Sequence, residues 1–356
     1  MMLSQYVSDK LKVMSFFAII LVLYIHAVFH DYPNEIQGMT YNFLMQEFIS
    51  GMIGRCAVPL FFAVSGYLFF VNVDLDAGDT TVIYAKMKKR VLTLLVPYLI
   101  AAWFPALFYL ALEYIPGVGG FINGEAFSEN FNRTIWDFLC FMYWDAGGGA
   151  PYAFHLWFLR DLIVIVALAP AIYHVLRCRM GGVLLLATLF VLIIMDVPYL
   201  PVYGMFWFVW GHCCLCRLSK VVGRLWFPCL LAFVVLCLAE LFFDSSVWGY
   251  LKVPVIMLGI TSMWTLYDKI VPETFRLSDH KYLLVACTYT FFVYLFHEPT
   301  LNVVRKILVI PFHHSSLGFA LSYLLSPWIF AALMTVAGVY VKRWMPRLYS
   351  ICVGGR

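Results

Sequence analysis

The sequence predicts an all-α protein, a polytopic integral membrane bundle of about ten transmembrane helices with both termini in the cytoplasm. Of its 356 residues, 63% are hydrophobic and 12% are charged, whereas soluble domains are about half apolar and about a quarter charged. A mean hydropathy of +0.86 excludes intrinsic disorder, which requires low hydrophobicity. The apolar residues also form runs near about 20 residues, the length at which a helix crosses a bilayer.

The ten predicted crossings alternate with turn-forming or charged segments. They are residues 14–29, 52–71, 91–112, 155–176, 183–200, 202–215, 225–243, 251–267, 282–308 and 317–341. Only a tight turn at Asp196, Pro198 and Pro201 separates the fifth from the sixth, so a merged or re-entrant pair there would change the count by one or two. The residues after the first crossing lack a small-residue cleavage site, and no signal peptide is expected to be removed.

The distribution of Lys and Arg sets the predicted orientation, because short cytoplasmic loops are enriched in these residues. With the N-terminus inside, eighteen of the 24 fall on the cytoplasmic side. The other six, outside or within the membrane, are Arg55, Arg133, Arg160, Lys252, Arg305 and Lys306. The basic residues form short clusters between apolar runs rather than one solvated face, so the net charge of +4 does not indicate nucleic-acid binding.

One outer connection, residues 113–154, is long and carries Trp136 and Trp144. Long connections in compact domains are functional covers or disordered spacers. The aromatic residues favour a packed cover over the site, and a solvated loop is the alternative. The whole chain, residues 1–356, is expected to form a single membrane domain.

Ionisable side chains inside a bilayer are costly unless paired or hydrated, which makes each one a functional candidate. His26 lies roughly 18 Å from the start of its predicted helix in a core roughly 30 Å thick, and therefore in the outer half. Three further helices place candidates at this depth. They are Arg55, the segment from His155 to Asp161 that contains Trp157 and Arg160, and His297 with Glu298. An imidazole oriented by a carboxylate is suited to removing a proton from a hydroxyl.

Each candidate also has a purely structural interpretation. A lone histidine on an apolar helix is usually hydrogen-bonded to a backbone carbonyl or a neighbouring helix. Arg160 and Asp161 are adjacent, so they point to different sides of the helix and need not pair. Arg55 can reach water from a helix end. The outer loops carry three further histidines that are expected to be solvated, His30, His313 and His314.

Other catalytic motifs are missing: the sequence has no HExxH, P-loop, dinucleotide-binding glycine motif or GxSxG. No spaced ligand pair supports metal binding by His26 and His297, so no metal is expected. Ser65 can be read as a nucleophile. However, it lies near the inner end of its predicted helix, far from the histidines, where small residues favour close helix packing.

Five segments, in their order and spacing, resemble the membrane-bound acyltransferase family 3, integral membrane O-acyltransferases of bacterial surface glycans and related eukaryotic proteins. They are residues 11–27 (LKVMSFFAIILVLYIHA), 58–68 (VPLFFAVSGYL), 86–99 (KMKKRVLTLLVPYL), 155–171 (HLWFLRDLIVIVALAPA) and 294–299 (YLFHEP). The family's signature histidine corresponds to His26. Ser15 stands where the family has an Arg eleven places earlier, with Lys12 one turn before it. A second expected Arg falls on Thr93, while Arg90 keeps the first.

The resemblance implies a ten-helix, multi-pass enzyme of the cell inner or cytoplasmic membrane. It would take an acyl group, usually acetyl, from acyl-CoA at the inner face and deliver it to a hydroxyl of a glycan or lipid-linked sugar at the outer face. His26 would then be the general base, with His297 and Glu298 positioning the base or the acyl carbonyl. The residues expected to bind the CoA phosphates are Lys12, Lys89 and Arg90. Those expected at the acceptor site are Trp157, Arg160, Asp161 and Arg55.

Two other functions remain open. A transporter or flippase of a lipid-linked sugar is one, although the sequence shows no inverted repeat of the kind common in such folds. A catalytically idle member of the family is the other, motivated by Ser15 at the signature position.

Overall fold

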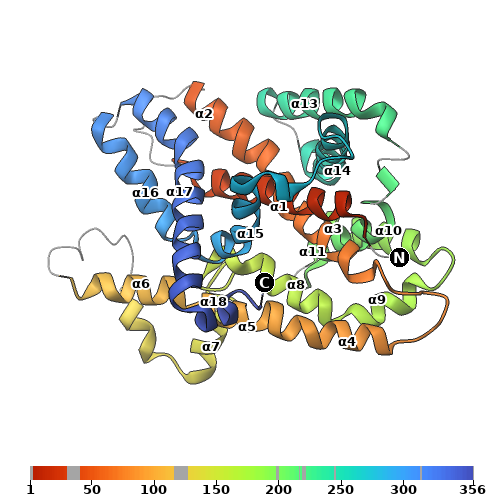
Figure 1. The fold of residues 1–356 in the computed structure, drawn as a ribbon, viewed down its shortest axis with the longest axis horizontal. Coiled ribbons are helices and arrows are strands. Elements are labelled where there is room, and N and C mark those ends of the chain that lie inside the picture. The colour runs from red at the N-terminus through yellow and green to blue at the C-terminus, as the bar shows by residue number, and fades with distance from the viewer. Residues whose placement is uncertain are drawn as a thin grey trace.

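The computed structural model describes residues 3–29, 41–115, 127–197, 200–215, 217–218, 222–243, 246–312 and 315–355. Within these ranges the chain is helical and has no strand. Five helices are long and apolar enough to cross a membrane, and there are six if one bent pair counts as a single span. The fold is therefore an all-α membrane bundle, which confirms the predicted class (Figure 1). The count of ten crossings and the cytoplasmic position of both termini stay predictions.

The helices have the following bounds. They are α1 (Gln5–His26), α2 (Tyr41–Gln46), α3 (Ala57–Phe70), α4 (Thr81–Arg90), α5 (Val96–Ala101), α6 (Trp103–Glu113), α7 (Ile135–Tyr143), α8 (Trp157–Ala167), α9 (Ala169–Leu176), α10 (Gly181–Ile194), α11 (Val202–Trp210), α13 (Trp226–Phe242), α14 (Val247–Ile270), α15 (Lys281–Phe296), α16 (Thr300–Val309), α17 (Ser316–Trp344) and α18 (Pro346–Cys352). Short 3-10 or π-helical segments extend or join them: η1 (Glu47–Ile53), η2 (Gly54–Cys56), η3 (Val91–Leu95), η5 (Phe127–Asn132), η6 (Phe154–Leu156), η7 (Gly211–Leu215), η8 (Gly223–Leu225), η9 (Leu277–Asp279) and η10 (Ile310–Phe312).

Two of the predicted crossings are broken helices. α8 and α9 meet at an angle of 58°. Pro170, in the first turn of α9, lacks an N–H group, and its ring crowds the carbonyl four residues earlier. The crossing predicted at residues 282–308 likewise divides into α15 and α16, with Pro299 just before α16. This second break places His297 where the backbone leaves α15.

The predicted fifth and sixth crossings correspond to α10 and α11, which are separate helices packed on each other. α10 ends at Ile194, and Asp196 adopts a φ of 49°, a left-handed conformation that Asp tolerates better than most residues. α11 continues through η7 to Leu215. Both helices are shorter than the about 20 residues of a full crossing, so length alone does not make them spans.

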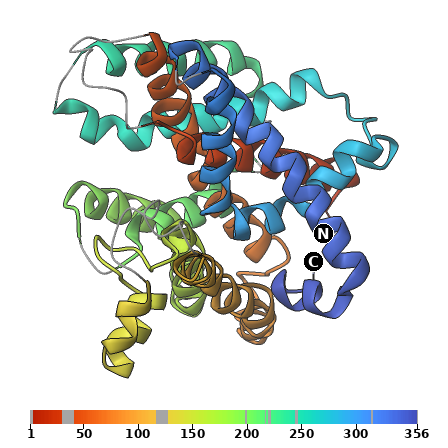
Figure 2. The ribbon, with the colours of Figure 1, turned by 90° about the vertical axis from the view of Figure 1, so that its left-hand side faces the viewer.

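The helix α1 lies inside the bundle and packs against α3, α15 and α17 (Figure 1, Figure 2). Buried charges fix its first turns. Lys10 is 1% exposed and forms a 2.7 Å salt bridge with Asp268 of α14. Asp9, also 1% exposed, accepts a hydrogen bond of 3.1 Å from the backbone N–H of Leu277. Because buried charges need their partners, these contacts hold α1 in register and thereby place His26 at its far end.

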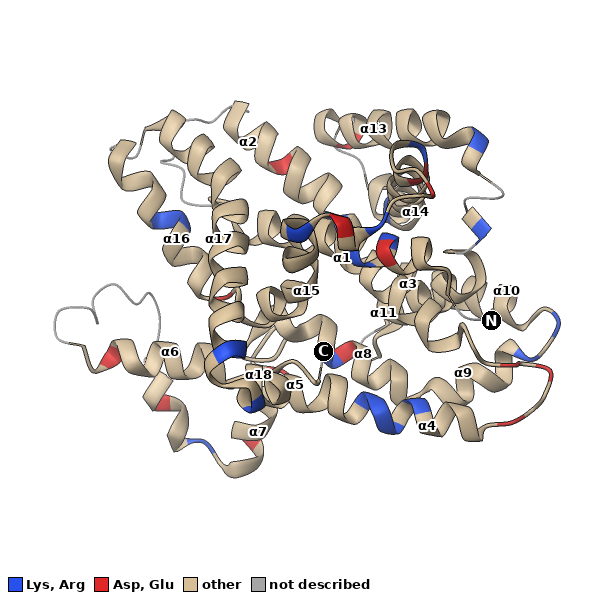
Figure 3. Ribbon diagram, viewed as in Figure 1, with Lys and Arg blue, Asp and Glu red and all other residues tan. Residues whose placement is uncertain are grey.

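Lys and Arg residues, coloured blue on the ribbon, occur along α4 and at the end of the bundle that holds the N-terminus and the starts of α10 and α13 (Figure 3). The sequence predicts that this end faces the cytosol. The inner face and outer face named below follow this predicted orientation.

The described part of the connection between α6 and α8 is packed at its two ends, whereas Trp136 and Trp144 are 77% and 48% exposed. Phe127 and Met142 are 2% and 0% exposed and form a small apolar cluster with Ala106 of α6. Glu113, at the end of α6, accepts hydrogen bonds from the backbone N–H groups of Phe127 and Ser128. Residues 116–126 lie outside the described part of the chain. That this connection covers the site stays a prediction.

Candidate active site

Three histidines from distant parts of the chain meet in one cluster. His26 is the last residue of α1, His155 lies in η6, and His297 follows α15. The ring centroids of His26 and His297 are 5.1 Å apart, and those of His155 and His297 are 4.7 Å apart. His155 and His297 are 3% and 0% exposed, whereas His26 is partly exposed. The cluster therefore has one partly exposed histidine beside two buried ones.

Backbone carbonyls of α15 determine which nitrogen of each buried imidazole carries its proton. His297 donates from Nδ1 to the carbonyl of Tyr294 at 2.7 Å, and His155 donates from Nε2 to the carbonyl of Leu295 at 3.2 Å. A carbonyl only accepts, so both nitrogens carry hydrogen in these contacts. The opposite nitrogens, His297 Nε2 and His155 Nδ1, are buried and have no hydrogen-bond partner among the described residues. In neutral imidazoles they are lone-pair acceptors, which is the state needed to accept a proton.

An aromatic side chain lies over the accessible histidine. The ring of Phe154, the first residue of η6, is 5.4 Å from that of His26 and 5.9 Å from that of His155. Phe154 is 47% exposed although it is apolar. The last residues of the outer connection thus reach the histidine cluster directly.

Glu298 and Arg305 lie beside the cluster at the break between α15 and α16. Glu298 is 8% exposed, and the positive charge of Arg305 acts on it electrostatically. Arg305 donates to the carbonyl of Val28, just beyond α1, and at 2.7 Å to the side chain of Asn302. It thereby joins α16 to the end of α1 that carries His26. The sequence placed Arg305 within a predicted crossing, which is the signal that identifies such residues, but assigned it no role at the site.

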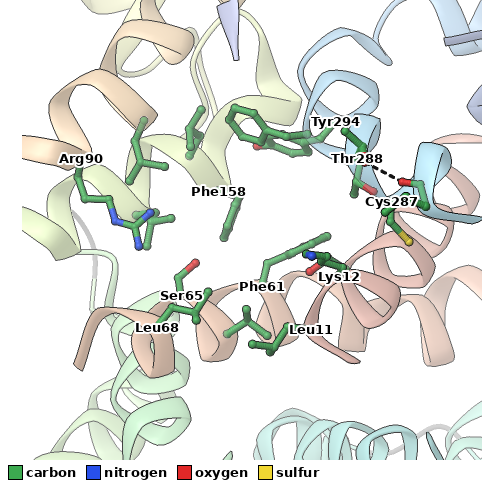
Figure 4. Close-up of a pocket in the computed structure, with 18 residues that line it drawn as sticks. Leu11, Lys12, Phe61, Ser65, Leu68, Arg90, Phe158, Cys287, Thr288 and Tyr294 are labelled. Atoms are coloured by element: carbon green, nitrogen blue, oxygen red, sulfur yellow. Dashed lines mark hydrogen bonds between the residues drawn. The ribbon is translucent and has the colours of Figure 1, made fainter. Parts of the chain in front are cut away.

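A cavity of about 540 Å³ lies on the inner side of the cluster (Figure 4). It opens between α1 and α3 on one side and α8 and α15 on the other, with α4 and η3 at one end. Its walls are mostly apolar. Its polar lining residues are Lys12, Ser15, Ser65, Arg90, Cys287, Thr288, Thr290 and Tyr294. Ser15 and Lys12 both line the cavity, whereas Lys89 is exposed and does not line it.

The cavity and the histidine cluster share a wall formed by Tyr294 and Phe158. Both residues line the cavity, and their rings are 5.8 Å apart. Tyr294 also contacts the cluster: its ring is 6.0 Å from that of His297, and its hydroxyl donates to the carbonyl of His155 at 3.1 Å. A cavity with two cationic lining residues and a group of proton acceptors therefore lie on the two sides of one aromatic wall.

Arg55 and Trp157, two of the residues predicted at the acceptor site, make contacts between helices. Arg55 forms a two-pronged salt bridge with Glu240 of α13, at 2.9 and 2.8 Å. The ring of Trp157 is 6.3 Å from that of Phe62 on α3. Whether either residue contacts an acceptor stays a prediction.

Arg160 and Asp161 form a salt bridge of 2.8 Å, so the expectation that adjacent residues point apart on the helix does not hold for this pair. The guanidinium of Arg160 also donates hydrogen bonds to the carbonyls of Trp144 and Gly149. It therefore joins α8 to the outer connection.

His155 is the member of the cluster for which the sequence predicted no catalytic role. The sequence placed it at the depth of the other histidines, at the start of the segment from His155 to Asp161, but did not indicate that it meets them. Within the described ranges, no group of three or more His, Cys, Asp or Glu side chains is arranged to hold a metal ion. His30, His313 and His314 lie outside the described residues.

A family model for an acyltransferase domain matches residues 9–342, and the chain belongs to this family, acyltransferase family 3. This confirms the resemblance found in the sequence. The chain is also similar to the succinoglycan biosynthesis protein ExoH of Rhizobium meliloti (strain 1021). The two are 24% identical over 367 residues, which cover 98% of this chain and 93% of ExoH. No solved structure gives a significant match.

Proposed function

We propose that this protein is an O-acyltransferase of the cell inner or cytoplasmic membrane. It transfers an acyl group, most simply acetyl, from acyl-CoA at the inner face to a hydroxyl of a cell-surface or lipid-linked saccharide at the outer face. Membership of the acyltransferase family supports the reaction class. The name of its relative, a succinoglycan biosynthesis protein, favours a glycan as the acceptor.

The observation that carries the proposal is the shared wall at Tyr294. On one side, Lys12 and Arg90 line an elongated, mostly apolar cavity. On the other, His155 and His297 present unprotonated nitrogens close to His26. Acyl-CoA fits a cavity with cationic lining residues and apolar walls, because its phosphates are anionic and its acyl thioester is apolar.

At the inner face, Lys12 and Arg90 attract the phosphates of CoA through charge-assisted hydrogen bonds. Lys89, one residue away on the exposed side of α4, adds positive charge at the approach to the cavity. The pantetheine arm and thioester then lie along the apolar walls and reach Tyr294 and Phe158.

At the outer end, His26 is the general base because it is the accessible imidazole of the three. It removes the proton of the acceptor hydroxyl while the oxygen attacks the thioester carbonyl. The C–S bond then breaks, the sulfur takes the proton from His26, and CoA leaves as the thiol. The unprotonated nitrogens of His297 and His155 accept a hydrogen bond from the N–H of His26 and so orient this base, and Glu298 offsets positive charge on His26.

The acceptor approaches beside the outer connection. Arg160 holds Trp144 and Gly149 of this connection against α8, and Asp161 orients Arg160. Together with Trp157 they shape the acceptor site, and Arg55 holds α13 in place through Glu240. The acceptor thus meets His26 beneath Phe154.

The test uses the full chain in lipid nanodiscs with radiolabelled acetyl-CoA and a saccharide acceptor. His26→Ala is expected to lower turnover about 10²- to 10⁴-fold, as removal of a general base does, with insertion unchanged. His174→Ala is the matched control, because His174 is exposed on α9. Retained transfer in His26→Ala would contradict the assignment. Lack of CoA release by the unchanged protein, with or without sugar transport, would favour the idle or transporter function instead.

A further inference from the structure

The cavity of about 540 Å³ that is proposed to bind the acyl donor is called the donor cavity below. A second and larger cavity, of about 1070 Å³, lies on the opposite side of α3 from it. The helix presents Phe61, Ser65 and Leu68 to the donor cavity. It presents Tyr67 and Phe70 of its last turn to the second one, which Val71, just beyond the helix, also lines. Because the two sets of positions point to different faces of one helix, α3 separates two distinct spaces. The reaction proposed above uses only the first.

The second cavity has a cationic edge. Arg179, from the loop between α9 and α10, and Arg217, which follows η7, both line it, and His212 of η7 lies beside them. No acidic residue is among its lining residues. Neither arginine forms a salt bridge with any residue in the described ranges. An uncompensated pair of arginines attracts an anion, and their planar guanidinium groups suit a phosphate.

One wall of the same cavity is apolar. Leu176, Val183 and Leu186 line it, and Val183 is 60% exposed. Its neighbour on α10, Leu184, is 62% exposed and apolar, as expected for a helix side that faces lipid chains. The cavity therefore combines a cationic edge with an apolar wall that continues onto the lipid-facing surface of the bundle. A molecule that fits both must be an anionic amphiphile.

We propose that this cavity binds an anionic phospholipid, with its phosphate between Arg179 and Arg217 and its acyl chains along α10. The arginines lie at the end of the bundle that the Lys and Arg distribution predicts to be cytoplasmic, and anionic lipids are enriched in that leaflet. Basic pockets at the cytoplasmic side of membrane helices are sites of this type. The site is independent of the acyl-transfer chemistry, because none of its lining residues belongs to the donor cavity or the histidine cluster.

The experiment measures lipid binding to the delipidated full chain in detergent, by native mass spectrometry during titration with phosphatidylglycerol or phosphatidylcholine. The test variant is Arg179→Ala/Arg217→Ala. The matched control is Arg224→Ala/Arg276→Ala, which removes the same charge from two exposed arginines that do not line the cavity. A basic residue near an anionic lipid contributes enough to change affinity about fivefold. The test variant should therefore lose about 25-fold in affinity for phosphatidylglycerol, and the control should not differ from the unchanged protein.

Three further arms distinguish the source of the phosphate and guard against misfolding. Arg179→Lys/Arg217→Lys keeps the charge and should keep most of the binding, which shows that a loss in the Ala variant is not a folding defect. Glycerol phosphate should compete only weakly, because the apolar wall contributes to lipid binding. Equal affinity of the test and control variants, strong competition by inorganic phosphate alone, or displacement of lipid by CoA at this cavity would each overturn the proposal.

Discussion

The histidine cluster and the donor cavity lie on opposite sides of Tyr294 and differ in their electrostatics. The cluster is built from imidazoles and aromatic rings, two of the imidazoles are almost fully buried, and its polar contacts are to backbone carbonyls. The cavity instead has Lys12 and Arg90 in its lining and offers apolar walls between them. Proton transfer benefits from a dry site where electrostatic interactions are strong, whereas binding of a multiply charged donor needs fixed cations near water. Under the proposed function, this difference places the chemistry in one region and the binding of the donor in the other.

The largest effect is expected at the cluster. His297→Ala removes the imidazole that lies between His26 and His155, and it should lower kcat about 100-fold with little change in KM for acyl-CoA. The measurement is steady-state kinetics in nanodiscs at saturating acceptor. A rise in donor KM with unchanged kcat would contradict the division between the two regions.

The next effect is expected at the donor cavity. Arg90→Ala removes a charged hydrogen-bond donor from the cavity lining and should raise KM for acyl-CoA about tenfold, with kcat nearly unchanged. Lys89→Ala is the matched comparison, because Lys89 lies one residue away but is exposed and should change KM only about two- to threefold. Equal effects of the two substitutions would show that general positive charge, not the cavity, binds the donor.

A smaller effect is expected at the wall between the regions. Tyr294→Phe keeps the ring but removes the hydroxyl that donates to the carbonyl of His155. A hydrogen bond of this kind contributes about 1 kcal/mol, so kcat should fall about fivefold while donor KM is unchanged. Tyr340→Phe, at an exposed tyrosine of α17, is the control. No change in kcat would indicate that the hydroxyl does not orient η6.

The smallest effect on activity is expected at Arg55, whose salt bridge lies outside both regions. Glu240→Gln leaves the guanidinium with a neutral partner and should lower the free energy of unfolding by about 1 to 3 kcal/mol, since the pair is mostly buried. Thermal unfolding in detergent measures this loss. A change in KM for the acceptor instead would show that Arg55 takes part in acceptor binding.

Much of the fold could be predicted because apolar length and Lys and Arg placement are local properties of the sequence. The helices α13, α14 and α17 agree with predicted crossings within a few residues. The breaks at Leu168 and at His297 were not predicted, although Pro170 and Pro299 are visible in the sequence. A proline in an apolar run bends some transmembrane helices and interrupts others, depending on whether neighbouring helices satisfy the exposed carbonyls.

The sequence by itself determined the membrane class and the family, and it predicts the depth at which His26 and His297 occur. Depth follows from counting residues along one helix, because each residue adds a fixed rise. Only the tertiary structure decided which side of each helix faces which neighbour. It brought His155 to His297, paired Arg55 with Glu240, and placed Lys12 and Arg90 in one cavity. Rotation and packing of helices depend on contacts between segments far apart in the chain, and no local pattern contains those contacts.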